Sequence, residues 1–138
     1  MSKSTILINL NRCTGCWTCS LACKQGNHLA DDEFWEYVRT QGSGKGIDRP
    51  AGVWPDLSMS WMPIYTRKCT MCGQRTAQGA EPFCVYNCPN QAMTFGDLDN
   101  PTSAVSQALE DLRQRNYQIF ELPEWEGTRT GIIYANRT

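Results

Sequence analysis

Eight cysteines are the residues of this 138-residue chain whose type and spacing point most directly to chemistry. The first four follow the pattern C-x2-C-x2-C-x3-C, and the other four follow C-x2-C-x11-C-x3-C-P. They are Cys13, Cys16, Cys19, Cys23, Cys69, Cys72, Cys84 and Cys88. Cysteines in such numbers form disulfides, bind zinc or hold iron–sulfur clusters, and their spacing separates these possibilities.

The spacing favours clusters. Disulfides usually join distant partners in secreted chains, and four-thiolate zinc sites usually combine two separated cysteine pairs. In the first motif a third cysteine follows the first pair after two residues, which would crowd a tetrahedral ion but matches three corners of a cubane. Bacterial ferredoxins carry this run, and its fourth cysteine binds the other cluster. We therefore predict two [4Fe-4S] clusters, with a zinc-binding scaffold protein as an alternative.

The repetition of the motif indicates two sites with exchanged ligands. Cluster I is expected to take Cys13, Cys16, Cys19 and Cys88. Cluster II is expected to take Cys69, Cys72, Cys84 and Cys23. Each x3 segment should form a helical turn that carries its last cysteine to the opposite site. Gly15 and Gly73 lie in or beside the first cysteine pair of each motif, where we expect left-handed backbone.

The remaining pattern predicts an α+β fold of one domain over 1–138, with a helix and tail over 99–138. Short strands are expected at 5–10, 91–96, 117–122 and 130–136, and a short helix at 20–27. A longer helix over 101–115 should have Asn100 as its N-cap and Pro101 as its first residue. Its expected apolar face consists of Ala104, Val105, Ala108, Leu109 and Leu112.

The segment between the two motifs, residues 31–66, is predicted to be an irregular insertion. Its centre over 41–52 is rich in glycine, which indicates a loop. Its flanks carry large aromatic and methionine side chains: Phe34, Trp35, Tyr37, Trp54, Met59, Trp61, Met62 and Tyr65. These side chains either cover the clusters or form a docking surface, since Trp, Tyr and Met are enriched at interface cores.

Composition excludes several other functions. With 13 Lys and Arg against 14 Asp and Glu, the chain has no basic stripe for nucleic acid. It contains no apolar run long enough for membrane insertion and no N-terminal export signal, so a cytoplasmic location is expected, with a periplasmic location by co-export with a partner as the alternative. Its one histidine, His28, should lie at the surface. No catalytic set of side chains can be assembled, and a cubane with four thiolates leaves no iron open to substrate. Electron transfer is therefore expected instead of catalysis.

The chain resembles the iron–sulfur electron-transfer (beta) subunits of the dimethyl sulfoxide reductase family of molybdenum or tungsten oxidoreductases. The matching stretches are NRCTGCWTCSLACKQGN at 11–27, RKCTMC-x11-CVYNCPNQAMTFGDLDNPTSAVSQAL at 67–109 and GTRTGIIYANR at 127–137. The resemblance implies a ferredoxin-like dicluster fold, [4Fe-4S] ligands at the eight cysteines, and a large catalytic partner subunit that carries a molybdopterin cofactor.

The chain departs from this family in its number of ligands. Typical members have sixteen cluster ligands and hence four clusters, whereas eight cysteines allow two. A shortened relay is expected to exchange electrons directly with a soluble ferredoxin or flavodoxin instead of a membrane quinol-oxidising subunit. A free-standing dicluster ferredoxin is a further alternative, but such proteins are usually strongly acidic, and the net charge here is −1.

Overall fold

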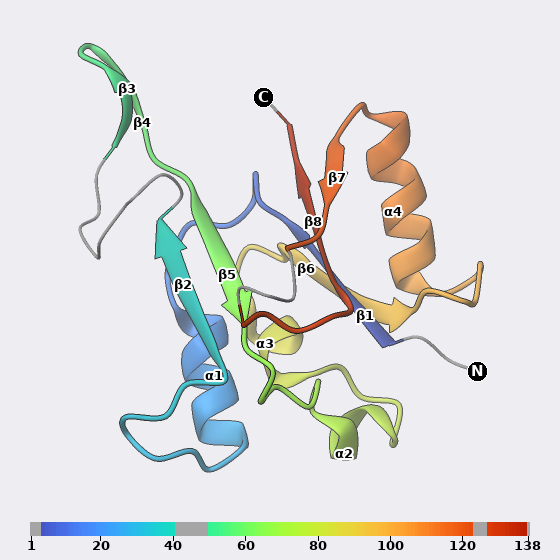
Figure 1. Ribbon diagram of the computed structural model, residues 1–138. Coiled ribbons are helices and arrows are strands. Elements are labelled where there is room, and N and C mark those ends of the chain that lie inside the picture. The colour runs from blue at the N-terminus through green and yellow to red at the C-terminus, as the bar shows by residue number, and fades with distance from the viewer. Residues whose placement is uncertain (1–3, 41–49, 123–126, 138) are drawn as a thin grey trace.

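The computed structural model describes residues 4–40, 50–122 and 127–137 (Figure 1). A four-stranded mixed sheet with the order β6-β1-β8-β7 lies at its centre. Its strands are β1 (Ser4–Asn9), β6 (Met93–Asp97), β7 (Gln118–Phe120) and β8 (Ile132–Asn136). β1 pairs antiparallel with β6 and parallel with β8, and β7 pairs antiparallel with β8. Strands from the two ends of the described chain therefore lie side by side, and all four strands predicted from the sequence are confirmed.

Strand β1 separates two packing layers because its side chains alternate between the two faces of the sheet. Leu7 packs with Val105 and Leu109 of helix α4 (Ala104–Gln114) in an aliphatic layer. Ile6 and Ile8 instead join a second core group that contains the cysteine side chains. The near-continuous apolar run of β1 thus reflects burial on both of its faces.

Helix α4 begins later than the sequence predicts. Its N-cap is Ser103, whose side chain accepts a hydrogen bond from the Ser106 N–H, so the assignment of Asn100 as the N-cap is wrong. The Asn100 side chain accepts a hydrogen bond from the Thr102 N–H in a preceding turn, which is the common alternative for this residue type. The apolar face is confirmed at Val105, Leu109 and Leu112, whereas Ala104 is exposed and Ala108 half-buried.

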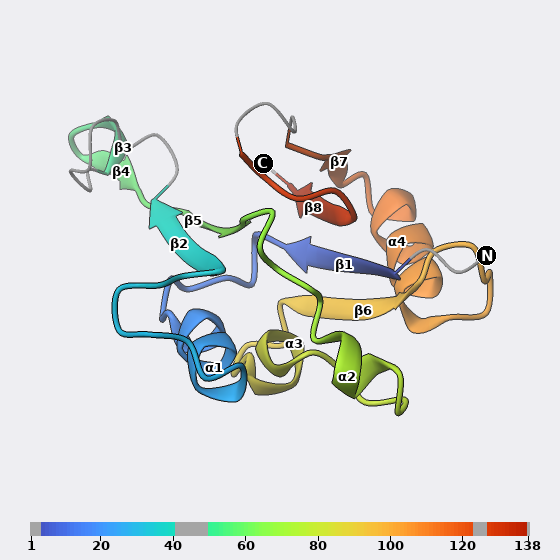
Figure 2. The same cartoon turned by 60° about the horizontal axis from the view of Figure 1, so that its bottom comes forward.

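Three short helices lie on the other side of the sheet from α4 (Figure 2). They are α1 (Thr18–Gly26), α2 (Gly73–Thr76) and α3 (Phe83–Asn87). Helices α1 and α3 contain the x3 segments of the two cysteine motifs, as predicted, and they pack against each other. Within the described ranges, no helix has the length and apolar content needed to cross a bilayer.

The prediction that residues 31–66 form an irregular insertion is wrong where the structure describes them. This segment contains two antiparallel pairs: β2 (Glu36–Thr40) with β5 (Trp61–Tyr65), and β3 (Ala51–Val53) with β4 (Asp56–Ser58). The side chains of β2 alternate between buried and exposed, a strand pattern that the flanking glycine-rich stretch obscures. Residues 41–49 lie outside the described part of the chain, so the expected loop stays a prediction there, whereas residues 51 and 52 belong to β3.

The large side chains of this segment divide between two roles. Trp61 and Met62 pack against the core group that contains Cys19 and Cys84, and Tyr65 is buried within it. Others are exposed, among them Phe34, Tyr37, Trp54 and Met59. The first group is thus placed to cover the cysteine site, and for the exposed group the docking surface stays a prediction.

Candidate metal centre

All eight cysteines lie within the described residues, and all are free thiols. Their positions follow from short local structures: Cys19 and Cys23 lie in α1, Cys84 lies in α3, and Cys72 precedes α2. Cys88 ends α3 at its C-cap. Burial varies widely around the site, because Cys19, Cys23 and Cys84 are buried whereas Cys16 is exposed.

The last cysteine of each motif lies near the first cysteines of the other motif. Burial is the main cause that raises the pKa of Cys13, and the nearby charges of Cys88 and Cys16 raise it further. Burial also raises the pKa of Cys23 to about 12, followed by the charges of Glu36, Cys69 and Cys72. The fold thus brings Cys88 toward Cys13 and brings Cys23 toward the second motif.

Cys19 and Cys84 connect the two groups of thiols. Burial is the leading cause of the raised pKa of both residues, and the charge of Cys84 adds to it at Cys19. The charges of Cys69 and Cys72 also raise the pKa of Cys84. Buried thiols with raised pKa values stay protonated unless a positive centre compensates their charge, which a bound metal supplies.

Main-chain N–H groups point at several of the sulfurs. The N–H of Met71 donates to Cys69 Sγ at 3.3 Å, and that of Ala92 donates to Cys88 Sγ at 3.4 Å. Hydrogen bonds also favour the thiolate of the exposed Cys16. Those from the Thr18 side chain and backbone are the main causes that lower its pKa. Hydrogen bonds of this kind stabilise thiolates and set the reduction potentials of iron–sulfur clusters.

The residue before the second cysteine is left-handed in both loops, and the backbone differs only at the residues that follow. Gly15 has φ +71, as predicted, and a Cβ built there would lie 2.5 Å from the ring of Trp61. The prediction for Gly73 is wrong, since the left-handed residues of the second loop are Met71 and Cys72, with φ 55 and φ 53. Helix α2 begins at Gly73, and ordinary helical backbone therefore replaces the expected turn there.

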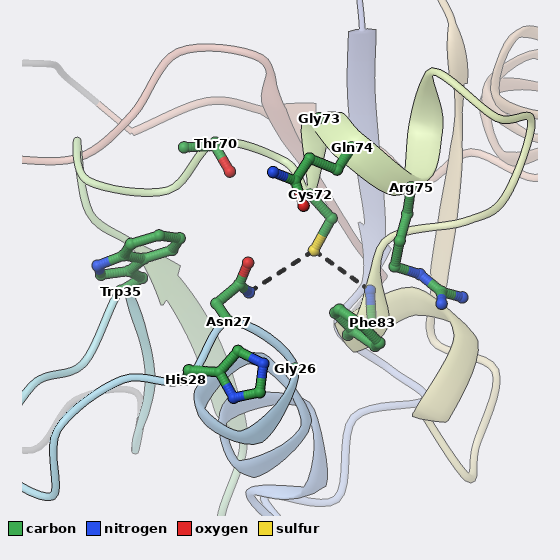
Figure 3. A pocket seen from close by; sticks show the side chains of 10 residues that line it. All are labelled: Gly26, Asn27, His28, Trp35, Thr70, Cys72, Gly73, Gln74, Arg75 and Phe83. Carbon is green, nitrogen blue, oxygen red and sulfur yellow. Dashed lines mark hydrogen bonds between the residues drawn. The ribbon is translucent and has the colours of Figure 1, made fainter.

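An open pocket of ≈ 690 Å³ borders the second motif (Figure 3). Asn27, Trp35, Cys72 and Phe83 are among the residues that line it. The Cys72 sulfur lies between Asn27 and Phe83 and accepts a hydrogen bond from the Phe83 N–H at 3.4 Å. His28 also lines this pocket and is exposed, as the sequence predicts.

Two buried side chains, Glu36 and Tyr65, lie beside the thiols; the sequence predicts no role for Glu36 and predicts only a covering or docking role for Tyr65. Glu36 is 1% exposed, and neither of its carboxylate oxygens has a hydrogen-bond partner of standard geometry. Burial raises the pKa of Glu36 to about 7, while the side chains of Cys19, Cys84 and Tyr65 lower it. Tyr65 donates its hydroxyl hydrogen to Cys84 Sγ at 3.2 Å. The alternation within β2 places Glu36 on the buried face, and that signal is present in the sequence.

The donor set fits thiolate-bound clusters. Thiols of both motifs lie near enough for their charges to act on one another's neighbours, several sulfurs receive N–H hydrogen bonds, and a buried carboxyl with unpartnered oxygens lies beside Cys19 and Cys84. Among the described residues, no three His, Cys, Asp or Glu side chains form a group that could hold a single metal ion. The site and fold thus define a domain whose two cysteine motifs share one thiol-rich layer.

Comparisons with known proteins identify the family. Residues 12–93 match the 4Fe-4S dicluster domain, and the chain belongs to this family. It is similar to the arsenate respiratory reductase iron-sulfur subunit ArrB of Shewanella sp. (strain ANA-3), with 49% identity over 151 aligned positions that cover 96% of this chain and 62% of the relative.

Further relatives carry similar names. A protein of Halobacterium salinarum, provisionally named as an iron-sulfur subunit of dimethyl sulfoxide reductase, is 32% identical over 94% of this chain and 43% of its own length. A sulfite dehydrogenase subunit of Allochromatium vinosum is 28% identical over 98% of this chain and 45% of its own length. This chain therefore spans about two-fifths to three-fifths of the length of these relatives.

Proposed function

We propose that this chain is an electron-transfer subunit that relays single electrons through two [4Fe-4S] clusters. The relay would connect an external redox partner with a catalytic subunit that carries a molybdopterin cofactor. The observation that carries this proposal is the thiol-rich layer, in which eight free cysteines from two motifs lie together in a dicluster family member. A bound [4Fe-4S] cluster supplies reversible one-electron transfer without an open iron site.

The proposed ligands are exchanged between the motifs. Cluster I would be held by Cys13, Cys16, Cys19 and Cys88, and cluster II by Cys69, Cys72, Cys84 and Cys23. The charge effects of Cys88 on Cys13, and of Cys69 and Cys72 on Cys23, support this exchange. Because α1 and α3 pack together, the last cysteine of each helical segment can reach the site of the other motif.

The ligand assignment is tested on anaerobically purified protein. Two cubanes contain about eight iron and eight sulfide per chain. Cys23→Ser should damage the cluster bound by Cys69, Cys72 and Cys84, and Cys88→Ser is the matched variant that should damage the other one. Iron and sulfide analysis measures how much cluster each variant holds, and EPR of the reduced protein shows which cluster is damaged. Stoichiometric zinc without sulfide would contradict the function, and loss of the cluster at Cys13 in the Cys23 variant would contradict the exchange.

The proposed docking surface for the catalytic subunit is the β3–β4 hairpin with its adjoining residues. This hairpin extends away from the central sheet (Figures 1 and 2), and it exposes 80% of Val53 and 81% of Trp54. Leu57 and Met59 are also exposed there. An apolar projection of this kind is typical of a protein interface, and several relatives are named as subunits of reductases or dehydrogenases.

The docking surface is tested in cells that produce both subunits. Trp54→Ala should weaken co-purification of the large subunit without changing the iron content of this chain. Tyr86→Ala is a matched control, because Tyr86 is another highly exposed aromatic residue but lies in α3. Equal loss of the partner in both variants would contradict a specific role for the hairpin.

The external redox partner is proposed to be a small soluble protein, either a ferredoxin or a flavodoxin. Reduction of the purified chain by a reduced ferredoxin or flavodoxin, followed by stopped-flow absorbance, tests it. A chain that accepts electrons from such donors but binds no catalytic partner would instead be a free-standing dicluster ferredoxin.

A further inference from the structure

Asn27 is a neutral side chain that touches sulfurs from both cysteine motifs. It follows helix α1 as the C-cap residue, and its Nδ2 donates to the carbonyl oxygen of Cys23 at 3.0 Å. The same nitrogen lies 3.7 Å from Cys23 Sγ and 3.8 Å from Cys72 Sγ, both within hydrogen-bond range for sulfur. Figure 3 shows Asn27 directed at the Cys72 sulfur from the side opposite Phe83.

The position of Asn27 makes these contacts effective. Asn27 is half-buried, so water competes less for its N–H groups than at an open surface. An N–H dipole directed at a sulfur stabilises negative charge there, and hydrogen bonds to the sulfurs are one of the factors that set cluster potentials.

We propose that Asn27 is a positioning residue that joins Cys23 to Cys72 and raises the reduction potential of cluster II. This inference rests on the proposed function, because it assumes that Cys23, Cys69, Cys72 and Cys84 hold one cluster. Its particular consequence is that a residue beside the first motif in sequence tunes the cluster of the second motif. In the described chain, the sulfurs that accept from this amide belong to Cys23 and Cys72, so the potential of cluster I should not depend on Asn27.

A purely structural role for Asn27 predicts a different result. The bond from Nδ2 to the Cys23 carbonyl stabilises the end of α1, and losing it would weaken the helix without a preference for either cluster. Asn87 provides a matched comparison, since its Nδ2 also donates to the carbonyl four residues earlier, that of Phe83, at 2.8 Å. Asn87 has no sulfur among its hydrogen-bond partners in the described chain.

The experiment compares Asn27→Leu with Asn87→Leu in the full chain with its clusters. Leucine has the same branching at Cγ but no N–H donor. Redox titration followed by EPR gives the midpoint of each cluster, and Cys13→Ser and Cys69→Ser variants assign the two signals. In Asn27→Leu, the reduced-to-oxidised ratio of cluster II should fall about tenfold at the wild-type midpoint, which corresponds to about 59 mV for one electron. The midpoint of cluster I should not change.

The control should keep both midpoints at their wild-type values. If the Asn27→Leu variant does not bind its full complement of iron and sulfide, the same redox titration is made on Asn27→Ala. Alanine removes the same N–H donor and is smaller than leucine. An unchanged midpoint for cluster II, or equal shifts of both clusters, would overturn the role of Asn27 and leave the electron-transfer function standing. A wild-type chain that binds no iron and sulfide would overturn the function as well.

Discussion

The two faces of the central sheet pack against different kinds of side chain. On the α4 face, Leu7, Val105, Leu109 and Leu112 form an aliphatic layer. On the opposite face, Ile6 and Ile8 pack among thiols, together with the hydroxyl of Tyr65. One strand, β1, supplies side chains to both layers.

This difference separates what hydrophobic burial stabilises from what the metal centre stabilises. The α4 layer consists of side chains that favour burial without any partner beyond hydrocarbon. The thiol layer contains Cys19, Cys84 and Glu36, whose pKa values burial raises, and their charged forms need compensation inside the protein. We therefore expect the two faces to respond differently to metal removal and to mutation.

The largest expected effect comes from removing the iron. Stripping the metal with a chelator under reducing conditions should abolish most of the cooperative thermal unfolding transition, because metal binding and folding are coupled in small domains of this kind. Circular dichroism at increasing temperature measures this, and restoring iron and sulfide should recover the transition. If the stripped chain still unfolded cooperatively, the α4 layer and the tail strands would be sufficient for folding.

A smaller effect is expected from a cavity in the aliphatic layer. Leu109 is buried on the α4 face, and Leu109→Ala should lower the free energy of unfolding by about 2–5 kcal/mol. Because this layer holds no thiols, iron and sulfide content per folded chain should stay at the wild-type value. A Leu109→Met variant, which nearly conserves volume, should cost less than about 1.5 kcal/mol. Loss of iron in Leu109→Ala at a temperature where it is folded would show that the two faces depend on each other.

The smallest expected effect distinguishes the two cysteine loops within the thiol layer. Gly15→Ala should destabilise the protein by about 1–3 kcal/mol, because the new methyl group would meet Trp61 and the backbone is left-handed. Gly73→Ala should be neutral or slightly stabilising, since nothing lies within 4 Å of a Cβ there. Melting temperatures of the loaded proteins measure both changes. Equal losses would contradict the conformational difference between the loops.

Local patterns in the sequence are sufficient for much of the fold. The alternating and apolar segments predict the strands of the central sheet, and the spacing of Val105, Leu109 and Leu112 predicts the buried face of α4. The sequence pattern places the start of α4 too early, because Asn100 and Ser103 are both good capping residues and the choice between them depends on a local turn. The strands of residues 31–66 escape prediction because short alternating runs beside glycine-rich segments carry a weak signal.

The cysteine spacing by itself determined that this chain has two repeated thiol motifs suited to cubane clusters, since that pattern is a local property of neighbouring residues. Tertiary structure alone decided which side chains join those motifs. Asn27 meets Cys72, Glu36 reaches Cys19 and Cys84, and Trp61 covers Gly15. These contacts connect residues far apart in the chain through the packing of α1 on α3 and the pairing of β2 with β5. The spacing of residues in the sequence does not predict these contacts, because they form where elements from different parts of the chain pack together.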